Sequence, residues 1–193
     1  MKKEKTAIER RISVYRICVI ALAVCINLVG GQIALVLRLP IYLDSIGTIF
    51  VGSVLGPIYG MLPNLLSGLI FGMTTDIYSL YYAPVGMLLG LMAGLVWKKK
   101  NNQFWWIFPA ALVITIPGTL VSSCITAWLF GGITSSGSTI LVQLLAKTPL
   151  GLTASVFVVQ ILTDYLDRLI SMWFVIRLLK VLPGQLLSSI KNR

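Results

Sequence analysis

Long apolar runs, separated by short polar or glycine- and proline-containing breaks, extend along nearly the whole chain. The hydrocarbon core of a bilayer is about 30 Å thick, which takes roughly 20 residues of helix. The pattern therefore predicts an all-α integral membrane protein, a single transmembrane domain over residues 1–193 with six transmembrane helices. A cytoplasmic segment, 1–11, is expected to precede spans at about 12–37, 45–60, 62–74, 82–97, 104–130 and 154–182.

The stretch 139–160 is the ambiguous part of this pattern. It is apolar, but Lys147, Thr148 and Pro149 interrupt it, and neither fragment reaches the roughly 20 residues of a span. We predict a short extra helix in the outer loop between helices 5 and 6, followed by an N-terminal extension of the last helix. The alternative is a seventh span, which would put the C-terminus on the other side of the membrane.

The positions of the basic residues favour six spans. With both termini cytoplasmic, only Arg38, Lys147 and Arg168 fall near the outer side, whereas the other basic residues of the pattern lie inside, as the positive-inside rule requires. These inner residues are Lys2, Lys3, Lys5, Arg10, Arg11, Arg16, Lys98, Lys99, Lys100, Arg177, Lys180, Lys191 and Arg193. Seven spans would place 180–193 outside and break the rule.

Composition supports the same class of protein. Hydrophobic residues make up 57% of the chain and charged residues 11%, against about 25% charged in soluble domains. The net charge of +10 is interpreted as a topology signal and not as a nucleic-acid surface, because the basic residues flank apolar runs. No nucleic-acid partner is expected.

The chain lacks residues that several kinds of catalysis and metal binding need. The chain has no histidine, which removes Ser-His and Cys-His catalysis and most transition-metal sites. The three cysteines, Cys18, Cys25 and Cys124, lie within apolar runs and are predicted to be buried, reduced packing residues. We expect no cofactor, no metal site and no catalytic residue, so the protein is not predicted to be an enzyme.

Four aspartates at the outer ends of the predicted helices carry the most information about function. Ionisable groups near hydrocarbon need a partner or a water-filled cavity. One interpretation pairs them with the outer arginines; the other places them in a polar cavity open to the outside, where tyrosines would suit a small heterocycle. The candidate substrate-binding residues are Arg38, Tyr42, Asp44, Asp76, Tyr78, Tyr81, Tyr82, Asp164, Asp167 and Arg168.

Other motifs are weaker. The spacing Asp164-x-x-Asp167 suggests a magnesium-diphosphate site, but the partners that a lipid transferase needs downstream are missing. No GxxxxGK[ST] phosphate loop is present, so ATP hydrolysis is not expected of this chain. Gly86, Gly90 and Gly94 form a stripe of small residues predicted to pack against a neighbouring helix.

Taken together, several segments resemble the substrate-binding S component of an energy-coupling factor (ECF) vitamin transporter. They are RICVIALA at 16–23, LPIYLDSIGT at 39–48, LGPIYG at 55–60, and DYLDRLIS at 164–171 on a last helix that ends LKVLP at 179–183. Length, six spans and cytoplasmic ends agree with that family across essentially the whole chain.

The resemblance implies a binding subunit of an ABC importer in a prokaryotic plasma membrane. Such a subunit binds a water-soluble vitamin or precursor in an outward-facing pocket and topples to release it inside. Its partners would be an ECF transmembrane coupling subunit and two ABC ATPase subunits, with docking through an AxxxA pattern that Ala21 and Cys25 match here with one replacement. The loops 38–44 and 74–82 would gate the pocket.

The vitamin and the function class both remain open at this level. Arg38, Lys147 and Arg168 would suit an anion such as pantothenate, whereas the tyrosines would suit pyridoxine or a thiamine precursor; cobalamin and folate are further alternatives. The competing functions are a magnesium-dependent membrane enzyme that uses the outer aspartates, and a structural membrane protein with no ligand.

Overall fold

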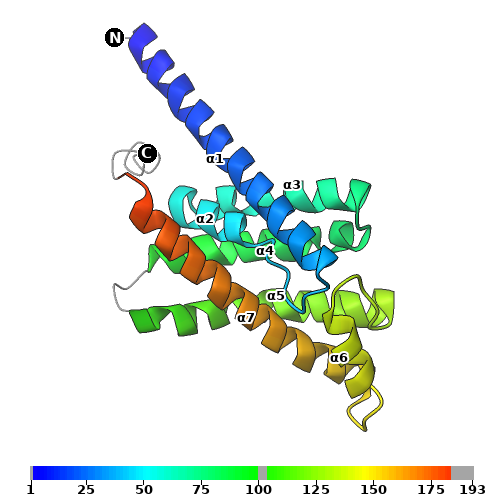
Figure 1. The fold of residues 1–193 in the computed structure, drawn as a ribbon. Helices are drawn as coiled ribbons and strands as arrows, with labels where there is room; N and C mark the ends of the chain where they lie inside the picture. The colour runs from blue at the N-terminus through cyan, green and yellow to red at the C-terminus, as the bar shows by residue number, and fades with distance from the viewer. Residues whose placement is uncertain (1, 100–103, 184–193) are drawn as a thin grey trace.

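The protein is built from α-helices. A computed structural model describes the backbone of residues 2–99 and 104–183, and the side chains of 14–99 and 105–183 (Figure 1). Lys100, Lys191 and Arg193 of the charge pattern lie outside the described residues. The described part has no strand; its elements are α1 (Lys2–Val36), α2 (Ile46–Leu55), α3 (Pro57–Thr74), α4 (Tyr78–Lys98), a 3-10 turn (Phe104–Trp106), α5 (Ile107–Phe130), α6 (Ser138–Leu145) and α7 (Gly151–Val181).

Three of these helices are long and apolar enough to cross a membrane: α1 over Val14–Val36, α4 and α5. The chain is therefore a membrane protein. The helix α2 is also apolar but has 10 residues, which at 1.5 Å per residue covers only about 15 Å, half of the hydrocarbon core.

The break between α2 and α3 differs from the predicted one. Spans were expected at 45–60 and 62–74, but α2 ends at Leu55 and α3 begins at Pro57. Gly56 lies between them with φ 93°, a conformation that glycine adopts without penalty. Pro57 then suits the first turn of α3, where its missing N–H has no helical partner to lose.

The break between α3 and α4 is shorter than expected. The polar stretch 74–82 was predicted as a loop, yet only Thr75–Ile77 separate the helices. Tyr78, Tyr81 and Tyr82 lie in the first turns of α4, where the i, i+3, i+4 spacing puts them on one face of the helix, and all three rings contact Phe130.

The ambiguous stretch 139–160 forms two helices. The predicted short extra helix is present as α6, and Ala146–Leu150 separate it from α7. The second fragment continues without interruption into α7, which has 31 residues.

The glycine stripe of α4 packs as predicted. A Cβ added at Gly90 would lie 2.0 Å from the carbonyl oxygen of Gly60 in α3, and one at Gly94 would lie 2.4 Å from Pro57. Such distances show that the backbones of α3 and α4 touch, so side chains are excluded from this contact.

One core lies between α1, α2, α4, α5 and α7. Its fully buried side chains include Ile49, Leu89, Ile114, Met172 and Val175. The cysteines do not belong to it: the prediction of buried cysteines is wrong, because Cys18, Cys25 and Cys124 are all exposed. In a membrane protein an exposed helix face can meet lipid or another helix, so an apolar side chain there is at no disadvantage.

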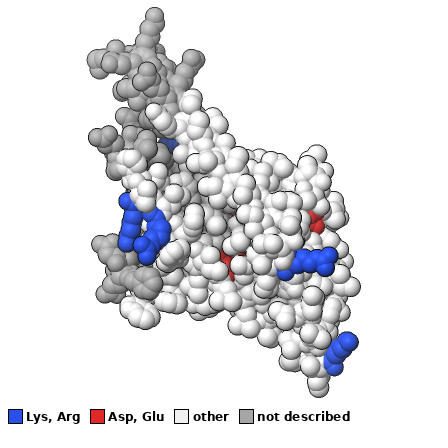
Figure 2. Space-filling view, in the orientation of Figure 1, with Lys and Arg blue, Asp and Glu red and all other residues white. Residues whose placement is uncertain are grey.

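The ends of the molecule are distinct (Figure 1). The first turns of α1 and the last turns of α7 lie at one end, and α6 lies at the opposite end. On the face drawn in Figure 2, basic side chains show at the left and at two places on the right, and two small acidic patches show near the centre and at the right. Most of the remaining described surface on this face is uncharged.

Candidate functional site

A cavity of about 130 Å³ lies among α1, α3, α4, α5 and α7, beneath the loops that precede α2 and α6. Its walls combine apolar, aromatic and acidic side chains. The lining residues that carry the argument below are Tyr42, Asp44, Phe71, Tyr82, Asp164 and Arg168.

Most of the predicted binding residues meet at this cavity. Those that line it are Tyr42, Asp44, Asp76, Tyr78, Tyr82, Asp164 and Arg168. Three others do not. Arg38 is exposed, Tyr81 is 47% exposed and packs on Phe130, and Asp167 is fully buried behind the cavity wall.

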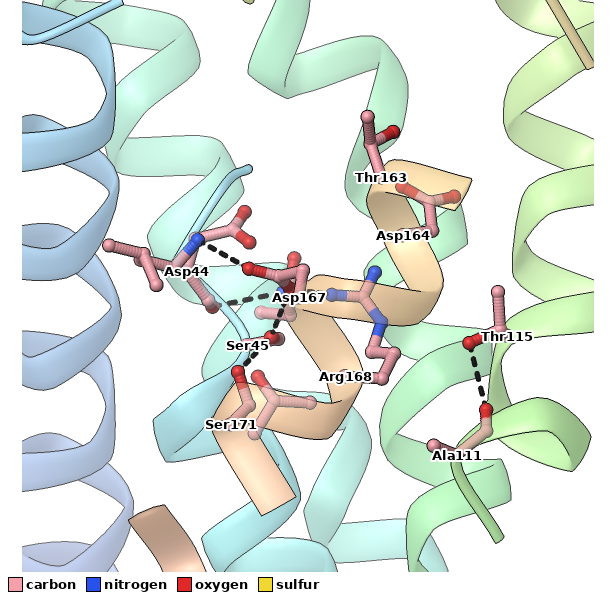
Figure 3. A network of polar contacts seen from close by, with 12 residues as sticks. Asp44, Ser45, Ala111, Thr115, Thr163, Asp164, Asp167, Arg168 and Ser171 are labelled. Atoms are coloured by element: carbon pink, nitrogen blue, oxygen red, sulfur yellow. Dashed lines mark hydrogen bonds and ion pairs between the residues drawn. The ribbon is translucent and has the colours of Figure 1, made fainter. Parts of the chain in front are cut away.

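Asp167 joins α7 to the loop that precedes α2 (Figure 3). One carboxylate oxygen accepts the N–H of Leu43 at 2.8 Å, and the other accepts the hydroxyl of Ser45 at 2.8 Å. Ser45 also lies 3.0 Å from the hydroxyl of Ser171, and Arg168 pairs with the same carboxylate. Both oxygens of Asp167 are therefore occupied, and its charge is compensated.

This loop has a strained backbone that its contacts hold in place. Arg38 and Leu43 have φ of 50° and 54°, the left-handed region that costs about 1–2 kcal/mol for a residue with a side chain. A Cβ at Gly30 would lie 2.2 Å from the Leu43 carbonyl oxygen, so the loop rests directly on α1. Asp167 fixes Leu43 from the opposite side.

Asn27 of α1 fixes the start of α2 below the loop. Its side-chain oxygen accepts the N–H of Gly47 at 2.8 Å, and its amide donates to Thr48 at 2.8 Å. Ser45 occupies the position where a side chain would cap α2, but its hydroxyl is committed to Asp167. Asn27 supplies the cap from another helix, so α1 and α7 together position Asp44.

The α5–α7 side of the cavity carries a chain of polar contacts. Thr119 donates to one oxygen of Asp164 at 2.6 Å. Gln160 accepts the hydroxyls of Ser122 and Ser123 and donates to Thr126 at 2.7 Å. Tyr82 of α4 meets Thr126 hydroxyl to hydroxyl, so the chain of contacts crosses from α7 through α5 to α4.

Asp76, between α3 and α4, connects its own loop to the α5–α6 loop at the rim of the cavity. Its carboxylate accepts the hydroxyl of Ser79 at 3.1 Å and that of Ser135, in the α5–α6 loop, at 2.8 Å. That loop also meets the strained loop before α2, since a Cβ at Gly137 would lie 2.0 Å from the Arg38 carbonyl oxygen. Opening the cavity at this rim requires these contacts to break.

The surroundings of Tyr42 and Asp44, in the loop before α2, raise the pKa of both side chains. Burial, followed by the charge of Asp167, raises the pKa of Asp44 to about 6, against the opposing effect of Arg168. Burial and the nearby charge of Asp164 raise the pKa of Tyr42 above its ordinary value, so its hydroxyl stays protonated. Tyr42 can therefore donate or accept a hydrogen bond in the cavity.

The spacing Asp164-x-x-Asp167, weighed above as a weak magnesium motif, does not bring both carboxylates to the cavity. Asp167 is bound to Leu43, Ser45 and Arg168 and does not line it. Within the described ranges, no group of three or more His, Cys, Asp or Glu residues is placed to hold a metal ion.

Sequence reasoning missed the uncharged part of the wall. Phe71, Asn64 and Ser67 of α3 line the cavity, as do Ser122 of α5 and Ser135 before α6. Asn64 carried the clearest signal, since an amide within an apolar helix needs a buried partner; here it donates to the Asp44 carbonyl at 3.3 Å.

Comparisons of the chain with protein-family models, with curated proteins and with solved structures found no match. The class that the fold and cavity define is that of a helical membrane protein with a pocket lined by polar and aromatic side chains.

Proposed function

We propose that this chain is the substrate-binding S component of an ECF-type importer for a water-soluble vitamin or vitamin precursor. The observation that carries the proposal is the cavity, in which aromatic and polar side chains from separate helices and loops converge within a membrane protein. A largely enclosed pocket with a few convergent polar groups is the usual form of a small-molecule site.

The network around the cavity supports binding more than catalysis. Asp167, Gln160 and Asn27 hold the loop and the helices in place through their side chains. Groups fixed in this way pre-organise a pocket and lower the entropic loss on binding. A magnesium enzyme that used the Asp164-x-x-Asp167 pair would need both carboxylates at the cavity, and Asp167 is instead bound to Leu43, Ser45 and Arg168.

The proposed topology has six spans formed by α1, α2, α3, α4, α5 and α7, with both ends in the cytoplasm of a prokaryotic cell. The three long apolar helices and the basic residues near one end support it. The cavity then faces the outside, and α6 lies in an outer loop.

Transport would need partners, namely an ECF transmembrane coupling subunit and two ABC ATPases. Ala21 and Cys25 are exposed on α1. The two small residues that match the docking pattern of the family are therefore open to contact with another helix. Close approach of two helices in a membrane depends on small residues at such positions.

Native mass spectrometry of the purified protein, released gently from detergent, tests the proposal. A bound mass the size of a vitamin is the expected result, because S components hold their ligands tightly. The control is Gly86→Leu, whose side chain would enter the cavity wall against Asn64, and which should lose the bound mass. Absence of any bound mass, together with a flat thermal-shift screen of water-soluble vitamins, would overturn the proposal.

A further inference from the structure

The charges on the cavity wall are unbalanced. Three acidic residues line it, Asp44, Asp76 and Asp164, against one basic residue, Arg168. Arg168 is 8% exposed and is paired with a fourth acid, Asp167, which is fully buried. Among the described residues, the one positive charge that lines the cavity is therefore already committed to a carboxylate behind the wall.

Other described cations near this end of the molecule do not reach the cavity. Arg38 and Lys147 are exposed and do not line it. Arg168 does act on Asp44 and Asp164 at a distance, but one guanidinium cannot neutralise three or more carboxylates. An anion that enters the cavity would be repelled by this excess of negative charge.

The two inner acids face the cavity from separate elements. Asp164 comes from α7 and is 6% exposed, with Thr119 on one oxygen. Asp44 comes from the loop before α2, which contacts on both sides hold in place. Carboxylates held apart in this way present acceptors to a ligand between them, and a charged donor would strengthen each hydrogen bond.

The remainder of the wall favours an organic ring. Phe71, Tyr42, Tyr78 and Tyr82 line the cavity together with aliphatic side chains such as Leu35 and Val85. Aromatic faces attract cations as well as flat rings. A bare metal ion would leave these apolar surfaces without a partner.

The size of the cavity limits the ligand. A volume of about 130 Å³ holds on the order of ten waters, at roughly 10–15 Å³ of such volume for each. A ligand that replaces them has about ten non-hydrogen atoms, the size of one ring with short substituents. Cobalamin and folate are far larger.

We infer that the cavity selects a small organic cation, an aromatic or heteroaromatic ring that carries a protonated amine or a quaternary nitrogen. This inference rests on the proposed binding function and names its substrate class. Asp44 and Asp164 hold the positive group, and Tyr42, Tyr82 and Phe71 contact the ring. Pantothenate, as an anion, is disfavoured at this site.

Three probes that share one ring test the sign of the ligand's charge. Binding of benzylammonium, benzyl alcohol and benzoate is measured on the purified full-length protein by titration calorimetry and thermal shift at pH 7.5. We expect benzylammonium to bind at least about tenfold more tightly than the other two. Equal or tighter binding of benzoate or benzyl alcohol would overturn the inference, as would stabilisation by magnesium or calcium ions alone.

Variants connect the result to named residues. Asp164→Asn keeps an acceptor for Thr119 and should weaken benzylammonium binding at least about tenfold, with no loss of melting temperature. Asp44→Asn serves as the second variant if Asp164→Asn is poorly folded. Lys147→Gln, outside the cavity, is the control and should bind like the native protein. Unchanged binding in both aspartate variants would contradict the assignment.

The outcomes separate the inference from the proposed function. An anionic or neutral bound molecule in native mass spectrometry leaves the binding subunit intact but overturns the cationic ligand. If no molecule copurifies, and neither the three probes nor the screen of water-soluble vitamins shows binding, the proposed function itself fails.

Discussion

Asp164 and Asp167 lie less than one turn apart on α7, and both are buried, yet their surroundings differ. Asp167 has two hydrogen bonds to the loop before α2 and an ion pair with Arg168. Asp164 has one threonine hydroxyl and otherwise faces the cavity. A satisfied buried carboxylate stabilises the fold, whereas one that lacks a compensating charge is available to a ligand.

Two kinds of helix contact also differ. The helices α3 and α4 meet backbone to backbone through glycines. Beside the cavity, α4, α5 and α7 are joined by hydroxyls and by Gln160. The first contact excludes side chains, whereas the second is made by polar side chains that reach across the space between helices.

The largest expected effect distinguishes the two aspartates. Asp167→Asn leaves Arg168 buried without its carboxylate, which should lower the free energy of unfolding by about 3–5 kcal/mol. Asp164→Asn removes a buried charge that no cation fully compensates, so its stability should not fall. Denaturant unfolding in detergent measures both, and equal losses in the two variants would break the comparison.

The next effect tests the glycine contact. Gly90→Ala places a Cβ 2.0 Å from the Gly60 carbonyl oxygen and should destabilise the protein by about 1–3 kcal/mol through overpacking. Gly118→Ala on α5 is the matched control, because its Cβ would meet only Val85 at 3.7 Å. That variant should be neutral or slightly stabilising, since alanine favours the helix. A stable Gly90→Ala protein would show that α3 and α4 are not in tight contact.

The smallest effect concerns pH. The pKa of Asp44 is about 6 in the folded protein, against an ordinary 3.8. Between these two pH values, the folded state therefore keeps a proton that the unfolded state has released. Stability of the ligand-free protein should therefore decrease as pH rises from about 4 to 6, by on the order of 1 kcal/mol after screening by water in the cavity. Asp44 faces three other charged residues, Asp164, Asp167 and Arg168 of α7. Its own contribution to the pH dependence is therefore measured as the difference between the native protein and a variant that lacks it.

Melting temperatures from pH 4 to pH 7 check this expectation. Asp44→Asn should show a flatter profile than the native protein, while Lys147→Gln, far from Asp44, should keep the native one. If Asp44→Asn retains the full slope, another group is responsible for it.

Much of the fold followed from local pattern. Apolar runs predicted the helices, and the interruption at Lys147 to Pro149 predicted the separate short helix α6. The boundaries at Gly56 and Tyr78 were placed wrongly, because apolar and tyrosine residues are compatible with either a helix end or its interior. The exposed cysteines were also missed, since lipid and protein surround a small apolar side chain equally well.

The candidate site was only partly accessible to such reasoning. Acidic and aromatic residues at helix ends indicated Asp44, Tyr82 and Asp164, all of which line the cavity. The separation of Asp167 from Asp164 depends on where the loop before α2 passes α7, which is a contact between residues more than 120 positions apart. Arg38 was an equally plausible partner by charge alone, but it is exposed and does not line the cavity.

By itself, the sequence determined that this is a helical membrane protein, because burying apolar segments in lipid is a local property of each run of residues. It also determined which residues near the outer helix ends carry charge and aromatic rings. Only the tertiary structure decided which of these charges are neutralised, because that depends on distances between elements far apart in the chain. Arg168 compensates Asp167 and leaves Asp44 and Asp164 at the cavity, and from that difference the proposed preference for a cation follows.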